Sequence, residues 1–150
     1  MSGVLGIPGR SPRNVQVKIS ALQAIPNNAT TAVAWASVNY DTSSFWDSAA
    51  PTRLTIPAGW GPTKVSLVGS LDFETNATGL RSITIQKNGT TRLVEAVLAA
   101  SSAHFGMNAS VHHLATGGDY FELMAYHNKG SAMNLQVSVF VPTFSLSVIG

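Results

Sequence analysis

The sequence predicts an all-β protein in which two antiparallel sheets pack against each other as a sandwich. Apolar and polar residues alternate along most of the chain, turn sequences separate the alternating stretches, and Ser, Thr and Asn number 17, 13 and 9. Short polar side chains compete with the backbone inside helices, whereas threonine packs well in strands. With 150 residues, the chain is long enough for one domain that buries roughly two thirds of its unfolded surface.

The alternation begins at Val15. Val15, Val17 and Ile19 lie on one face of an extended chain, and the intervening polar side chains lie on the other. Similar stretches occupy residues 32–38, 52–56, 64–74, 80–87, 91–99, 103–114, 120–127, 133–140 and 143–149. We therefore expect about ten strands.

Turn residues separate these stretches. Asn88-Gly89 favours a type I′ hairpin, because both residues tolerate a positive φ. Other turns are predicted at residues 26–28, 57–59, 76–79, 117–119 and 128–130. The alanine-rich stretch 93–101 is compatible with a helix, but it is short and surrounded by strands, so we predict a strand there. About ten short strands joined in this way favour a jelly roll.

Residues 1–14 differ from the rest of the chain. This segment is rich in Gly and Pro, and it contains Arg10 and Arg13 but no acidic residue. It is too poor in large apolar residues to form a core of its own. The sequence thus predicts a flexible basic attachment arm over 1–14, suited to an acidic protein surface, and a jelly-roll domain over 15–150.

Composition argues against several functional classes. The formal net charge is +2 and only 11% of residues are charged, which does not favour nucleic-acid binding. The sequence contains neither a run of 18 apolar residues nor the apolar core of a signal peptide, so it predicts no membrane span. Without cysteine, the chain forms no disulfide.

The residues that carry chemistry form no recognisable catalytic or metal-binding set. His112 and His113 are adjacent, so a regular strand directs them to opposite faces. His104 and His112 can share a face, with His127 near them across strands, but surface or symmetry-axis histidines are the expected alternative to a metal site. Asp41 and Asp47 are too few for a calcium loop, and no Gly-x-Ser-x-Gly elbow is present. We expect no enzyme activity, no cofactor and no metal.

The loop 41–52 is the most informative segment for binding. Phe45 and Trp46 stand beside Asp47 among small polar residues, and Trp60 lies in a Gly-Pro turn. Aromatic faces next to carboxylates suit sugar recognition, which makes these four residues a candidate ligand-binding loop. The alternative is that the rings pack against the sandwich or against a neighbouring protomer.

Several short motifs occur in a characteristic order. They are Val38-Asn39-Tyr40-Asp41, Phe45-Trp46-Asp47, Arg53-Leu54-Thr55-Ile56-Pro57-Ala58-Gly59, Ile85-Gln86-Lys87-Asn88-Gly89, Gly118-Asp119-Tyr120-Phe121-Glu122-Leu123 and Phe144. Over about residues 15–150 the sequence resembles the globular head of the complement q subunit, which shares its fold with tumour necrosis factor. More narrowly, it resembles the bacteriophage and environmental-virus versions of this domain.

The resemblance implies a ten-stranded jelly roll that assembles as a homotrimer and has a binding or structural role rather than an enzymatic one. We therefore expect a bacteriophage structural protein: a trimeric knob that acts as capsid decoration or head appendage. It would lie on the virion surface after assembly in the host cytoplasm. Its partners would be its own copies and a capsid or other virion protein contacted by the arm. A start at Met1 only about fifteen residues before the domain favours decoration over a fibre tip.

Two alternatives remain open at this point. The chain can be the receptor-binding module of a phage fibre or spike, recognising a host-surface glycan or protein through the loop aromatics. It can also be a jelly-roll enzyme, which would require bound metal.

Overall fold

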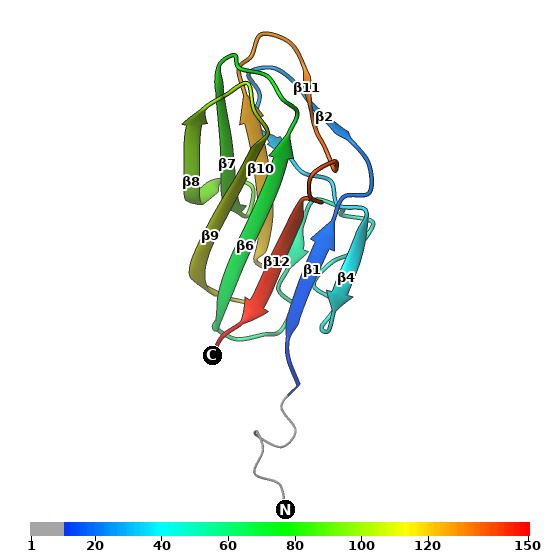
Figure 1. The fold of residues 1–150 in the computed structure, drawn as a ribbon. Coiled ribbons are helices and arrows are strands. Elements are labelled where there is room, and N and C mark those ends of the chain that lie inside the picture. Colours follow the sequence, from blue (N-terminus) through cyan, green and yellow to red (C-terminus); the bar gives the residue numbers. More distant parts are fainter. Residues whose placement is uncertain (1–10) are drawn as a thin grey trace, which may run out of the picture.

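The computed structural model describes residues 11–150, which form twelve strands in two antiparallel sheets (Figure 1). Arg10 and most of the predicted arm lie outside the described residues. The start of β1 and the end of β12 lie at the same end of the sandwich, because these two strands are antiparallel neighbours.

Sheet A is built around β6. Its strands are β1 (Asn14–Lys18), β2 (Gln23–Ile25), β4 (Ser37–Asp41), β6 (Thr63–Phe73), β9 (Phe105–Ala115), β11 (Met133–Leu135) and β12 (Thr143–Val148). On one side, β6 pairs with β9 along its whole length. On the other side it pairs with β12 and, at Phe73, with β11, while β1 and β4 continue the sheet beyond β12.

Sheet B forms the second layer. Its strands are β3 (Thr31–Ala32), β5 (Leu54–Thr55), β7 (Leu80–Lys87), β8 (Thr91–Ala99) and β10 (Tyr120–His127). The order across the sheet is β3, β10, β7 and β8, and β5 also pairs with β10.

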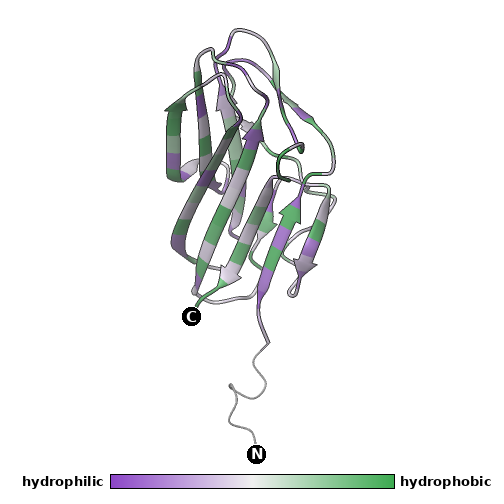
Figure 2. Ribbon diagram, in the orientation of Figure 1, coloured by the Kyte–Doolittle hydropathy of each residue, from purple (hydrophilic) through white to green (hydrophobic). Residues whose placement is uncertain are grey.

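The core lies between the two sheets. Val65, Leu67 and Leu71 of β6 are fully buried and face fully buried residues of sheet B such as Ile83 and Leu123. Figure 2 shows the alternation of apolar and polar residues along the strands. Truncating one of these aliphatic side chains to alanine removes about 2–5 kcal/mol of stability.

The expected strand 32–38 is two strands in different sheets. β3 pairs with β10 in sheet B, whereas β4 pairs with β1 in sheet A. Between them the chain crosses the edge of the sandwich, and the buried side chains of Val33 and Trp35 continue the apolar alternation through the crossing. Because the alternation is continuous, the sequence did not reveal that the chain changes sheets here. The short strand β2 was also not predicted.

The expected strand 133–140 ends early. Only Met133–Leu135 form β11, and the chain then passes over the outward side of β6. The backbone N–H of Gln136 donates to the Asp72 carbonyl, and that of Val139 lies 3.4 Å from the Asp72 carboxylate. Val139 is 64% exposed, so its place in an alternating series does not reflect a buried strand.

The predicted hairpin at Asn88-Gly89 is confirmed. Both residues have positive φ, 52° and 76°, as a type I′ turn requires. The turn joins β7 to β8, which also confirms strand rather than helix over 91–99. Asn88 additionally bonds β10, because its side-chain carbonyl accepts the N–H of Tyr120 and its amide donates to Asp119.

Asp119 accepts hydrogen bonds from two turns at the end of the sandwich where β7 ends and β10 begins. Burial would raise the pKa of Asp119, but hydrogen bonds from Asn88 and the Thr116 N–H, together with the Lys87 ammonium at 3.3 Å, outweigh burial and lower the pKa below its usual 3.8. The ionised form is therefore the one that the fold stabilises.

This pKa shift predicts a pH-dependent stability. The contribution of Asp119 is present above its unfolded pKa and is lost as pH falls through the lower folded pKa. We expect Asp119→Asn to lower the melting temperature at pH 7, and the gap to wild type to close below about pH 4. Circular-dichroism melts between pH 7 and 2 measure this, with exposed Asp47→Asn as control. A gap that does not vary with pH would contradict the assignment.

Candidate functional site

The loop 41–52 is organised by one carboxylate. Asp41, the last residue of β4, accepts hydrogen bonds from the backbone N–H groups of Phe45 at 3.0 Å and Trp46 at 2.9 Å, and a longer one from Ser43. The chain also turns at Ser44, whose φ is 57°. Because the carboxylate oxygens are engaged by the loop's own backbone, Asp41 acts as a structural cap.

The two aromatic residues of this loop have different positions. Phe45 is 1% exposed and contacts Trp60 edge to face at 5.7 Å, so its ring is part of the core and is not presented to a ligand. Trp46 is half-buried, and its indole N–H donates to the Pro51 carbonyl at 3.1 Å. Asp47 is exposed and caps the N–H of Ala49. Of the predicted ligand-binding residues, only Trp46, Asp47 and Trp60 thus reach the surface.

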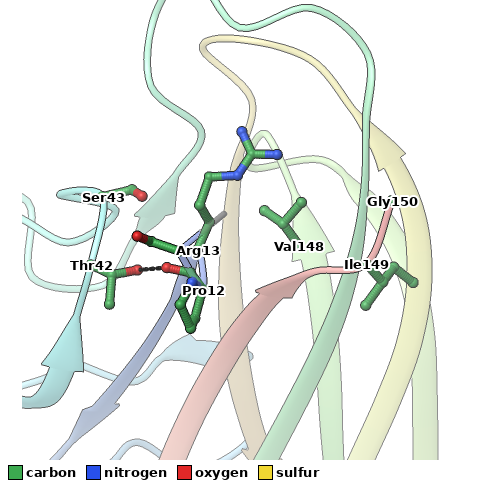
Figure 3. Close-up of a pocket in the computed structure, with 8 residues that line it drawn as sticks. Pro12, Arg13, Thr42, Ser43, Val148, Ile149 and Gly150 are labelled. Atoms are coloured by element: carbon green, nitrogen blue, oxygen red, sulfur yellow. Dashed lines mark hydrogen bonds between the residues drawn. The ribbon is translucent and has the colours of Figure 1, made fainter. Parts of the chain in front are cut away.

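Arg13 belongs to the folded domain rather than to a free arm. Its guanidinium carbon lies 4.7 Å from the centre of the Trp60 ring, and its carbonyl accepts the N–H of Val148. Thr42 holds the preceding residue by donating to the Pro12 carbonyl. Arg13 lies beside an open cavity of about 630 Å³, and Figure 3 shows the residues that line it. The cavity is lined by Ser11, Pro12, Arg13, Thr42, Ser43, Val148, Ile149 and Gly150.

The histidines lie apart. His112 and His113 face opposite sides of β9, as predicted, and burial together with the Lys87 ammonium lowers the pKa of His113. His104 lies 3.2 Å from the buried Asp72 carboxylate, and His127 is buried against the Ile25 carbonyl. Within residues 11–150, no three histidine or acidic side chains are grouped closely enough to hold a metal ion.

The outward face of sheet A is the largest feature that sequence reasoning did not identify. Strand pairing aligns Gln16, Ser145, Val68 and Ser110 in one row across four strands. Ser147, Ser66 and His112 form the row beside it, and Ser70 and Asn108 pair on the other side. Asp72 is the acidic residue on the β6 part of this face, and it is fully buried. The signal in the sequence was serine on one face of both strands, at Ser66 and Ser70 of β6 and at Ser145 and Ser147 of β12.

A second surface lies along the open edge of the sandwich between β8 and β9. Pairing with the buried Arg81 directs Leu98 toward the interior, yet its side chain is 53% exposed. Leu98 therefore leaves apolar area uncovered at this edge. Leu114, which pairs with Lys64 and is 60% exposed, belongs to the outward face of sheet A.

The cap at Asp41 predicts a local loss of order. We expect Asp41→Ala to destabilise the protein by about 1–3 kcal/mol, because two well-formed hydrogen bonds to the carboxylate disappear. Chemical denaturation measures the change, and quenching of the tryptophan fluorescence should increase as the loop around Trp46 loosens. Asp47→Ala is the matched control, since it removes a single cap from an exposed position. Equal effects of the two substitutions would contradict this role of Asp41.

Among the described residues, no helix has the length and apolar character needed to cross a membrane. A scan of family models and a search of curated proteins found no match to the chain.

Comparison with solved structures identifies the fold. The chain is similar to the tumour necrosis factor Eiger of S. frugiperda, with a TM-score of 0.70 and 8% identity over 94% of each chain. It is also similar to murine APRIL (TM-score 0.71, 11% identity, 93% of this chain and 100% of that one). A third similar structure is the globular domain of zebrafish complement 1qA (TM-score 0.63, 10% identity, 92% and 98%). The predicted fold is thereby confirmed: the chain is an antiparallel jelly roll of the tumour necrosis factor and complement q type.

Proposed function

We propose that this chain forms a homotrimer that serves as a surface knob of a bacteriophage virion, as capsid decoration or head appendage. The observation that carries the trimer is the pair of unlike surfaces described above. The outward face of sheet A presents rows of serine with few charges, and the β8–β9 edge presents the exposed Leu98.

Two unlike surfaces on one chain favour a ring. A head-to-tail contact between them repeats around an axis and closes when the rotation permits, whereas a two-fold dimer needs one self-complementary patch. Serine rows allow close approach of another subunit without burying charge, since the lysines of this face, the half-buried Lys18 and the exposed Lys64, lie at strand ends. Leu98 at the edge, together with Val68 and Leu114 on the outward face of sheet A, supplies the apolar area that such a contact buries.

The virion role rests on the sequence. The motifs Arg53–Pro57, Lys87–Gly89 and Gly118–Leu123 resemble the viral versions of the domain in composition and order. The basic segment before Arg13 suits attachment to an acidic shell protein. A display protein of this kind needs no catalytic group.

The trimer has a direct test. We expect wild type to have a mass near three times 15.7 kDa by light scattering, persisting on dilution. Ser110→Arg introduces a charge in the middle of the outward face of sheet A and should give monomers, because burying an unpaired charge is strongly unfavourable. Ala77→Arg, in the exposed loop before β7, is the control. A monomeric wild type would remove this proposal, and a trimeric Ser110→Arg variant would exclude this face.

Attachment through the arm is tested separately. Deleting residues 1–10 retains the Thr42–Pro12 and Arg13–Trp60 contacts, so the truncated protein should keep its fold and its mass. We expect it to be lost from assembled particles, measured by co-sedimentation with shells lacking the knob. The full-length Arg10→Gln variant shows how much of the effect comes from charge. Incorporation of the truncated protein at the wild-type level would overturn the attachment role.

A second candidate function is recognition of a host-surface glycan. Trp46 and Trp60 remain partly exposed, Asp47 follows Trp46 in the loop, and Trp60 contacts Arg13 of the cavity lining, which supports this interpretation of the loop. A glycan array compared between wild type and Trp46→Ala distinguishes it: loss of a signal supports binding at the loop, and an unchanged signal places binding elsewhere.

A further inference from the structure

The outward face of sheet B contains a small cleft whose origin is visible in the strand register. Ser82 of β7 lies directly opposite Tyr126 of β10 on one side and Val97 of β8 on the other. A short side chain between two larger neighbours on the same face leaves a hollow. The hollow has a volume of about 150 Å³ and is lined by Thr30, Ser82, Arg92, Glu95, Val97 and Tyr126.

The polar groups around this cleft are held in place before any ligand arrives. The Tyr126 hydroxyl donates to the Asn28 side chain at 2.7 Å, which orients the ring. One Glu95 oxygen accepts from Arg92 at 2.9 Å and from the Thr84 hydroxyl at 3.1 Å. Groups fixed in this way lose little conformational entropy on binding.

The chemistry of the lining matches a neutral sugar ring. The Tyr126 ring and Val97, which is 50% exposed, offer apolar surface to the C–H face of a pyranose. A carboxylate and a guanidinium side by side present a planar set of acceptors and donors to neighbouring hydroxyl groups. Arg92 and Glu95 also cancel each other's charge, which does not favour an anionic ligand.

The cleft is compatible with the proposed trimer. Alternation along β8 directs Val97 to the outward face of sheet B, whereas Leu98 faces the open edge assigned to the subunit contact. The outward face of sheet B thus remains available when the outward face of sheet A is covered.

We propose that this cleft is a subsite for one neutral monosaccharide unit of a surface glycan. The inference rests on the second proposed function, glycan recognition, and assigns it to the sheet B face instead of the loop 41–52. It does not depend on attachment to a virion.

The test is a titration of ¹⁵N-labelled full-length protein with the methyl glycosides of glucose, galactose, mannose and N-acetylglucosamine, each up to about 50 mM, where millimolar affinity is detectable. We expect at least one glycoside to shift the amide signals of Ser82, Glu95 and Tyr126. Glu95→Gln preserves shape but replaces the carboxylate acceptor, and should weaken that binding about tenfold.

Two control variants test whether the sugar binds in the cleft and not elsewhere on the protein. Glu122→Gln changes a carboxylate on the same face that is held by the Thr52 hydroxyl, outside the cleft lining, and should bind like wild type. Trp46→Ala should also bind like wild type. Melting curves confirm that each variant is folded.

The possible outcomes distinguish the position of the sugar site from glycan recognition as such. Sugar binding that survives Glu95→Gln but is lost in Trp46→Ala would overturn the cleft and leave glycan recognition at the loop. No shift with any neutral glycoside would overturn the cleft, and the glycan array then decides separately whether the loop 41–52 recognises a glycan. A response to methyl N-acetylneuraminic acid alone would contradict the neutral class.

Discussion

Pairing of β6 on both of its edges is the constraint on which the rest of the structure depends. The β6–β9 ladder runs from Thr63 to Phe73 without a register shift, and the β6–β12 ladder continues it on the other side. A shift of one residue would expose Val65, Leu67 and Leu71 and bury the serines between them. The same register that builds the core therefore also composes the outward face of sheet A.

The two outward faces differ in a way that suggests a division of roles. The sheet A face carries rows of serine with little charge, as expected of a surface that approaches another subunit. The sheet B face carries Tyr126, Arg92 and Glu95, which are held by hydrogen bonds and surround a hollow. Aromatic and arginine side chains are enriched where proteins recognise ligands and partners. The proposed subunit contact and the proposed sugar subsite thus lie on opposite sides of one sandwich.

Loops at one end of the sandwich are ordered by two carboxylates, the half-buried Asp41 and the buried Asp119. Asp41 binds the backbone of the loop after β4, and Asp119 joins the β7–β8 turn to the start of β10. Both residues bind backbone or turn groups within this chain. Their carboxylates therefore have a role in loop structure, whereas Trp46 and Arg92 keep a solvent-facing edge.

The sequence by itself determined the fold class, the hairpin at Asn88-Gly89 and most of the strands, because a period of two and a turn with positive φ are local properties. It did not reveal the crossing at Trp35, where buried side chains continue the alternation while the chain changes sheets. Nor did it show that Phe45 is in the core, because the small polar residues around Phe45 are compatible both with a buried ring and with an exposed one. Only the tertiary structure decided which positions of different strands lie side by side. Both the serine rows of sheet A and the cleft at Ser82 depend on hydrogen-bonded register between segments far apart in the chain.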